Sequence, residues 1–119
     1  MGNMWTASTA VIDNHIRQHC VVMYSTTICS YCTKTKQLLS ELNIDCDVVE
    51  LNLLSPSDGG HVSQDLIKKT NVRTVPQIFI NGEFIGGYSE IMALKQAGSL
   101  FERISKCSKP CFKATETSG

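Results

Sequence analysis

The spacing of apolar residues in the first half of the chain predicts alternating helices and strands. Val11, Ile12 and Ile16 recur at helical spacing, which is typical of a short amphipathic helix. The run Cys20–Tyr24 is rich in β-branched and aromatic residues, which favours a buried strand. The elements predicted for this half are a helix at residues 6–17, a strand at Cys20–Tyr24, a helix at Thr33–Leu42 and a strand at Cys46–Leu51.

In the second half, the clearest local pattern is an Asn81-Gly82 dipeptide between two short apolar runs. Asn-Gly suits the two-residue turn of a β-hairpin, so we expect a hairpin here. Serine, proline, aspartate and glycine fill residues 55–60, which predicts a loop. The elements predicted for this half are a helix from Ser63 to Lys69, strands at Gln77–Ile80 and Glu83–Ile85, and helices at residues 89–96 and 99–106.

This order of elements predicts an α/β fold. A β-α-β unit followed by a helix and a hairpin gives a four-stranded mixed sheet with helices on both faces. The 119 residues fit one domain with a single core. We place that domain at residues 1–107 and a polar C-terminal tail at residues 108–119.

Charge and composition argue against two classes of partner. Eleven basic and eleven acidic residues cancel, so no overall field attracts the chain to nucleic acid or to an anionic membrane. No apolar run approaches the ~18 residues that span a bilayer. We therefore expect a soluble protein with neither nucleic acid nor membrane as a partner.

Two cysteines, Cys29 and Cys32, lie between the first predicted strand and the helix that follows it. Unpaired N–H groups and the positive end of the helix dipole stabilise a thiolate at such a position. The pKa of a cysteine placed this way falls from about 8.5 to between roughly 3.5 and 7.5, and the thiolate is the attacking species. The motif therefore predicts a redox site.

The alternatives to a redox site are a zinc site and an unreactive structural pair. Zinc takes four ligands, and paired knuckles lie within about 20 residues of each other. The only other close pair, Cys107 and Cys111, is far along the chain, and none of the three histidines forms a Cys-plus-His set at finger spacing. The count of six cysteines would also fit a secreted disulfide scaffold. The chain has no signal-like apolar start, so we expect a reducing compartment instead.

Three segments, in this order, make residues 11–106 resemble the glutaredoxins, which are glutathione-dependent members of the thioredoxin fold. They are Cys29-Ser30-Tyr31-Cys32, Thr74-Val75-Pro76 and Gly86-Gly87-Tyr88-Ser89-Glu90. The Ser-Tyr filling between the cysteines resembles the mitochondrial and nuclear branch of that family. The resemblance implies a thioredoxin fold and thiol–disulfide exchange with glutathione as reductant and cofactor.

The resemblance also implies a glutathione-binding groove beside the cysteines. It makes the Val75–Pro76 bond cis, with the backbone of Val75 turned toward the ligand. Where the family usually has a lysine, this chain has Thr26, and we expect that change to weaken binding of the glycine carboxylate. The implied glutathione-binding residues are Thr26, Tyr31, Gln64, Arg73, Thr74, Val75, Pro76, Gly87, Ser89 and Glu90.

In the implied mechanism Cys29 attacks a glutathionylated protein and becomes glutathionylated itself, and a second glutathione then reduces it. Cys32 closes an internal disulfide when a protein disulfide is the substrate. The partners are then glutathione and disulfide-containing or glutathionylated proteins, in the cytoplasm or mitochondrial matrix, with the nucleus as a third option.

Two other functions stay open at this point. One is a thioredoxin-like reductase that ignores glutathione. The other is a [2Fe–2S] carrier or sensor, in which Cys29 of two subunits and two glutathione thiolates supply the four ligands of the cluster. We expect a monomeric protein, and the cluster alternative implies a cluster-bridged homodimer.

The same resemblance pairs Cys20 with Cys107 in a disulfide remote from the active site. Two free buried thiols are the alternative, and Cys111 is an alternative partner. Cys46 is expected to face the core. Residues 1–6 match an N-myristoylation pattern, which is a weak indication in so short a segment.

Overall fold

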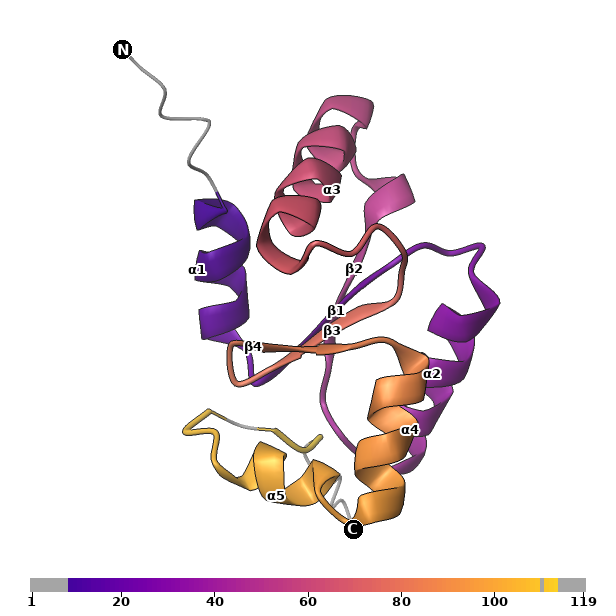
Figure 1. The fold of residues 1–119 in the computed structure, drawn as a ribbon, viewed down its shortest axis with the longest axis vertical. Coiled ribbons are helices and arrows are strands. Elements are labelled where there is room, and N and C mark those ends of the chain that lie inside the picture. The colour runs from indigo at the N-terminus through magenta and orange to yellow at the C-terminus, as the bar shows by residue number, and fades with distance from the viewer. Residues whose placement is uncertain (1–8, 110, 114–119) are drawn as a thin grey trace, which may run out of the picture.

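A four-stranded mixed sheet forms the centre of the molecule, with helices on both of its faces (Figure 1). The structure is a computed structural model that describes residues 9–109 and 111–113. The start of the first predicted helix, the acylation pattern and most of the predicted tail lie outside these residues. The fold class predicted from the sequence is confirmed.

The sheet has the strand order β2-β1-β3-β4. Strand β1 pairs in parallel with β2, whereas the β1–β3 and β3–β4 pairs are antiparallel. The bounds of the strands are β1 Val21–Ser25, β2 Asp47–Glu50, β3 Gln77–Ile80 and β4 Glu83–Gly86.

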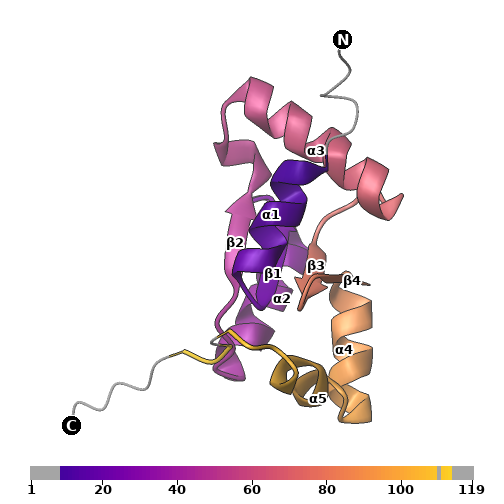
Figure 2. The same ribbon diagram turned by 90° about the vertical axis from the view of Figure 1, so that its left-hand side faces the viewer.

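Helices α1 and α3 cover one face of the sheet, and α2 and α4 cover the other, with α5 beyond the end of α4 (Figures 1 and 2). The bounds of the helices are α1 Ala10–Gln18, α2 Ser30–Glu41, α3 Pro56–Thr70, α4 Tyr88–Ala97 and α5 Leu100–Ser105, with a short 3₁₀ turn η2 at Leu51–Leu53. None of the helices in the described part of the chain is both long and apolar enough to cross a membrane.

Strand β1 supplies side chains to a hydrophobic core on each face, because successive residues of a strand point to opposite sides. Val22 and Tyr24 pack with α1 and α3, whereas Val21 and Met23 pack with α2, α4 and α5. All four are buried. The strand is therefore fixed on both sides, and so is the point at which it ends, where the thiol motif begins.

The hairpin is formed at the predicted place. Asn81 and Gly82 have positive φ angles of 52° and 82°, as the two central residues of a tight hairpin turn require. The antiparallel register pairs Ile80 with Glu83 next to this turn. Strand β4 then delivers the chain to the start of α4 beside the thiol motif (Figure 1).

The loop predicted for residues 55–60 is wrong, because α3 begins at Pro56. The Ser55 hydroxyl accepts a hydrogen bond from the Asp58 N–H at 3.1 Å, and proline suits the first position of a helix. A Cβ at Gly59 would lie 2.9 Å from the Leu51 carbonyl oxygen. The glycine that indicated a loop therefore allows this helix to pack closely against the preceding turn.

Part of the segment assigned to a polar tail packs on the domain. Cys111 is buried and Phe112 forms an isolated β-bridge with Ile44. The Asp45 N–H also donates to the Cys111 carbonyl at 2.9 Å. This packing differs from the expectation, because apolar side chains at residues 111 and 112 interrupt an otherwise polar segment and cover the end of α2.

Cys20 and Cys107 form a disulfide, with their Cα atoms 5.9 Å apart. It joins the residue before β1 to the second residue after α5, 87 positions apart in the sequence. Cys29, Cys32, Cys46 and Cys111 are free.

Candidate active site

Cys29 lies at the junction of β1 and α2 and is the N-cap residue of α2. Its backbone is extended, and its sulfur accepts a hydrogen bond from the Cys32 N–H at 3.1 Å. That N–H has no partner within the helix, because it belongs to the first turn. The sulfur of Cys29 therefore takes the place of a capping oxygen, in a position that favours negative charge.

Cys32 lies one turn into α2 and is fully buried, with 0% of its surface exposed. Burial raises the pKa of its thiol above the ordinary value, because the charged form loses its hydration. The two cysteines therefore differ: Cys29 is partly exposed, whereas Cys32 is held as a protonated thiol behind it.

The segment before β3 forms the opposite side of the site. The Val75–Pro76 peptide bond is cis, as the resemblance implied. The Val75 carbonyl oxygen lies 3.7 Å from the Cys29 sulfur and can accept its S–H. Gln77 is buried below this bend, and its amide donates to the carbonyls of Val72 and Thr74 at 2.8 and 3.1 Å. These bonds hold the bend against the end of the sheet.

The start of α4 closes the site on its third side. The Gly87 N–H donates to Glu90 Oε1 at 2.7 Å, so this carboxylate caps the helix. A Cβ at Gly86 would lie 2.6 Å from the Glu90 side chain, and Gly86 has a φ of +129°. A Cβ at Gly87 would lie 3.2 Å from the Pro76 carbonyl oxygen. Glycine is therefore needed here for the helix to approach the cis-proline bend.

A cavity of about 550 Å³ lies between these elements. Tyr31 and Tyr88 contact each other across it, with ring centroids 5.7 Å apart. The residues that line it are Tyr31, Val72, Thr74, Val75, Pro76, Phe84, Ile85, Gly86, Gly87, Tyr88, Ser89 and Glu90.

Seven of the ten predicted glutathione-binding residues line this cavity: Tyr31, Thr74, Val75, Pro76, Gly87, Ser89 and Glu90. Sequence reasoning missed Val72, Phe84, Ile85, Gly86 and Tyr88. Gly86 and Tyr88 belong to the segment Gly86-Gly87-Tyr88-Ser89-Glu90, which had already been identified as a motif from the sequence. Their place in that motif could have indicated that they line the cavity. Phe84 and Ile85 were assigned to a strand only, and no local pattern indicates that they face a cavity.

Three predicted residues, Thr26, Gln64 and Arg73, are not among those that line the cavity. Thr26 precedes the thiols, and its carbonyl accepts the Cys29 N–H at 3.4 Å. Gln64 on α3 and Arg73 after α3 are both exposed. Their part in ligand binding stays a prediction.

Two lysines on α2 are candidates for replacing the cation that Thr26 lacks. Lys36 pairs with Glu50 at 2.5 Å, so its charge is already engaged. The Lys34 amino group lies 5.2 Å from the centroid of the Tyr31 ring, at the edge of the cavity. Lys34 is therefore the better placed of the two.

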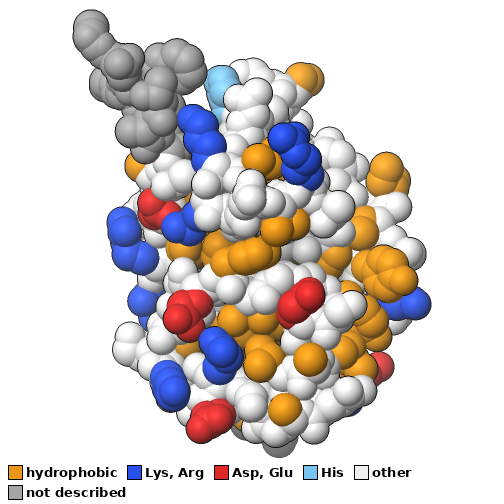
Figure 3. Space-filling model, in the orientation of Figure 1, with side chains coloured by type: hydrophobic (Ala, Val, Ile, Leu, Met, Phe, Trp, Pro, Cys, Tyr) orange, Lys and Arg blue, Asp and Glu red, His pale blue; other side chains and the backbone are white. Residues whose placement is uncertain are grey.

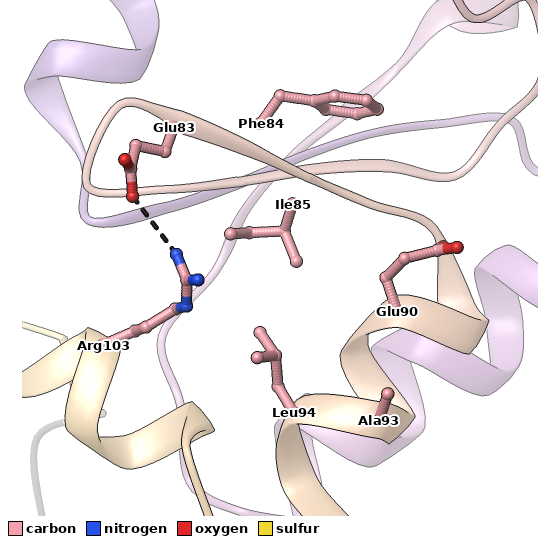
Figure 4. A pocket seen from close by; sticks show the side chains of 7 residues that line it. All are labelled: Glu83, Phe84, Ile85, Glu90, Ala93, Leu94 and Arg103. Carbon is pink, nitrogen blue, oxygen red and sulfur yellow. Dashed lines mark hydrogen bonds and ion pairs between the residues drawn. The ribbon is translucent and has the colours of Figure 1, made fainter. Parts of the chain in front are cut away.

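A second cavity, of about 450 Å³, adjoins the first along β4 and α4. Figure 4 shows Ile85 and Leu94 facing each other across it and the Glu83–Arg103 ion pair at one end. Phe84, Ile85 and Glu90 line both cavities. Hydrophobic side chains gather across the middle of this face, with charged ones around them (Figure 3).

Comparison with known proteins identifies the family. The family model described as glutaredoxin matches residues 21–85. The chain is 43% identical to the mitochondrial glutaredoxin-2 of Homo sapiens over 88% of its own length and 63% of that protein's. It is 41% identical to the mitochondrial glutaredoxin-2 of Bos taurus, over 90% of its own length and 67% of the length of the bovine protein. The chain thus spans about two thirds of these relatives.

Solved structures agree with the sequence comparison. The crystal structure of a buckwheat glutaredoxin–glutathione complex superposes with a TM-score of 0.76 at 31% identity, covering 82% of this chain and 86% of the buckwheat chain. With a Cys-X-X-Cys motif at a helix N-terminus, facing a cis-proline bend in this fold, the chain belongs to the glutaredoxin family.

Proposed function

We propose that this chain is a glutathione-dependent thiol–disulfide oxidoreductase in which Cys29 is the nucleophile. The observation that carries the proposal is the position of the Cys29 sulfur. It accepts the Cys32 N–H at 3.1 Å at the N-terminus of α2, and it adjoins Val75, which lines the 550 Å³ cavity. A reactive thiolate needs this kind of stabilisation and access. The buckwheat relative solved as a complex with glutathione supports glutathione as the ligand.

The reaction with a glutathionylated protein proceeds in two exchanges. The Cys29 thiolate attacks the glutathione sulfur, the substrate S–S bond breaks, and the protein leaves as a thiolate that takes up a proton. A second glutathione thiolate then attacks the glutathione sulfur on Cys29. This step releases the Cys29 thiolate and glutathione disulfide, so the disulfide passes from the substrate to glutathione and one free glutathione is consumed per turnover.

Cys32 has a separate role, which applies to protein disulfides. The first attack leaves a mixed disulfide between Cys29 and the substrate. Cys32, which is buried directly behind Cys29, then attacks Cys29, loses its proton to the departing substrate thiolate and closes an internal disulfide. Because burial raises the pKa of Cys32, this thiol reacts only with a sulfur already bound next to it.

Glutathione occupies the cavity as an extended peptide in this proposal. Its backbone pairs with Val75 as an added strand, and its γ-glutamyl carboxylate lies at the N-terminus of α4, near Ser89. The Glu90 carboxylate, already capping the helix, retains lone pairs for the ligand's ammonium group. Thr26, Gln64 and Arg73 lie outside this pocket lining and would contact the glycine end.

One chain alone cannot supply the ligands of the [2Fe–2S] alternative. Such a cluster takes four thiolates. At this site Cys29 is partly exposed, but Cys32 is fully buried and its thiol is held protonated. A single chain thus presents one ligand, the cluster would need a second subunit and two glutathione thiolates as well, and we assign no step to it.

Turnover with glutathione as the sole reductant tests the proposal against a thioredoxin-like reductase. We expect the protein to reduce a glutathionylated peptide at a rate proportional to protein concentration. Cys46→Ser is the matched control, because Cys46 lies outside the cavity, and it should keep this rate. Failure with glutathione, together with reduction of protein disulfides by a thioredoxin-type reductant, would contradict glutathione dependence.

The compartment is a separate inference. The human and bovine relatives are named as mitochondrial proteins, which supports the mitochondrial matrix among the compartments predicted from the sequence.

A further inference from the structure

Two histidines and an aspartate meet where α1 lies against the edge of the sheet. His15 is on α1, His19 is its C-cap residue, and Asp47 begins the edge strand β2. One ligand atom of each of these three side chains lies within 4.8 Å of the other two. Figure 2 shows α1 lying across β1 and β2, the arrangement that brings these segments together.

We propose that His15, His19 and Asp47 bind one divalent late transition-metal ion, with Zn²⁺ as the reference ion. Imidazole nitrogen and carboxylate oxygen are ligands that such ions prefer. Three protein ligands leave a coordination position for water, as in open zinc sites. The spacing of four residues between the histidines places both rings on the same side of the chain, with ring centroids 5.4 Å apart.

The buried side of the cluster orients His15 for this role. The Tyr24 hydroxyl lies 2.9 Å from His15 Nδ1. With a metal ion on Nε2, the His15 ring carries its proton on Nδ1, and the Tyr24 hydroxyl accepts that N–H. In the metal-free arrangement Nε2–H donates to Asp47, and an ion bound between His15, Asp47 and His19 would replace that proton. Metal-binding histidines characteristically have such a partner on the second ring nitrogen.

Only small side-chain movements separate the present arrangement from a bound one. His15 Nε2 and Asp47 Oδ2 are 2.5 Å apart, and two ligands of a tetrahedral zinc ion lie about 3.3 Å apart. His19 is exposed and the Asp47 side chain is 38% exposed, so both can adjust and solvent can deliver the ion. Without metal, His15 and Asp47 hydrogen-bond to each other.

The site is remote from the thiols. Asp47 pairs with Val22 near the start of β1, whereas Cys29 follows the end of that strand. A metal ion here would tie α1 to β2 and would stabilise the native state by mass action, without blocking Cys29. We therefore expect metal binding at this site to raise the melting temperature, including that of a chain that lacks both active-site thiols.

Titration with ZnCl₂ tests the proposal in a chain that carries Cys29→Ser and Cys32→Ser, which removes the competing thiol pair. We expect one ion per chain by calorimetry. His19→Ala should weaken binding at least tenfold, and Tyr24→Phe should weaken it about tenfold or more through the orientation of His15. His61→Ala is the matched control, because His61 is an exposed histidine on α3, and it should bind zinc like the parent.

The visible absorption of bound Co²⁺ reports on the metal ligands directly, so it distinguishes loss of a ligand from loss of structure. Co²⁺ in this site should give visible bands without a sulfur-to-cobalt charge-transfer band, and His19→Ala should lose them while its circular dichroism stays native. Equal zinc affinity in His19→Ala and His61→Ala would overturn the proposal. So would the absence of saturable binding, or a charge-transfer band that shows cysteine ligation.

Discussion

The free cysteines of this chain differ in the environment of each sulfur. Cys29 is partly exposed and accepts the Cys32 N–H, whereas burial raises the pKa of Cys46 to about 12. Burial also raises the pKa of Cys111. Because only a thiolate is an effective nucleophile, these environments decide which sulfur reacts.

We predict that iodoacetamide at pH 8 modifies Cys29 well before Cys46 in the folded protein. Mass spectrometry of the digested peptides measures the order. A raised pKa keeps Cys46 protonated, so its labelling should increase only as the pH rises from about 9 toward 12, and the stability linked to that proton is lost over the same range. Urea-unfolded protein is the control, in which both should react. Equal rates in the folded protein at pH 8 would contradict the assignment.

Site residues could be predicted from the sequence where their role depends on residues close to them in the chain. The strand-to-helix junction predicted the different positions of Cys29 and Cys32, whereas the cis bend at Pro76 was implied by the resemblance. The sequence was insufficient for Phe84 and Ile85, which face the cavity only because β4 lies beside α4. The residues around Phe84 and Ile85 in the sequence do not indicate that α4 packs beside β4.

At the element scale, the same limit explains the misplaced start of α3. Proline and glycine at residues 56–60 indicated a loop, since glycine costs about 1 kcal/mol relative to alanine in a helix interior. The Ser55 cap and the close packing of Gly59 against Leu51 favour the helix instead. Tertiary contacts thus outweighed local propensity. The hairpin turn was predicted correctly because its signal is local.

We predict that Ser55→Ala lowers the free energy of unfolding by about 1 kcal/mol, because the Asp58 N–H loses its acceptor. Urea denaturation followed by circular dichroism measures the change. Ser57→Ala is the matched control in the same helical turn, and it should change stability by less than about 0.5 kcal/mol. If both variants are equally stable, the Ser55 cap contributes nothing and the start of α3 at Pro56 needs another cause.

At the scale of the whole molecule, long-range contacts close the fold at both ends. The Cys20–Cys107 disulfide joins the start of β1 to the end of α5, and the Ile44–Phe112 bridge joins the segment between α2 and β2 to the C-terminal segment. The resemblance implied the disulfide. The bridge was not foreseen, because its partners are far apart in the sequence and only the packed domain brings them together.

We predict that reducing the Cys20–Cys107 disulfide lowers the stability of the native protein by up to about 4.6 kcal/mol, because the closed loop is long. Thermal unfolding with and without dithiothreitol measures this effect. In Cys107→Ser the reductant should have little effect. An equal response of both proteins to dithiothreitol would show that this disulfide does not stabilise the fold.

The central claim, that Cys29 alone carries exchange with glutathione, is tested most directly by comparing Cys29→Ser and Cys32→Ser. Each variant is assayed with a glutathionylated peptide and with a protein disulfide, using glutathione as reductant. We predict that Cys29→Ser is inactive with both, whereas Cys32→Ser keeps activity of the same order with the glutathionylated peptide and loses reduction of the protein disulfide. A Cys32→Ser variant as inactive as Cys29→Ser with the glutathionylated peptide would contradict the claim.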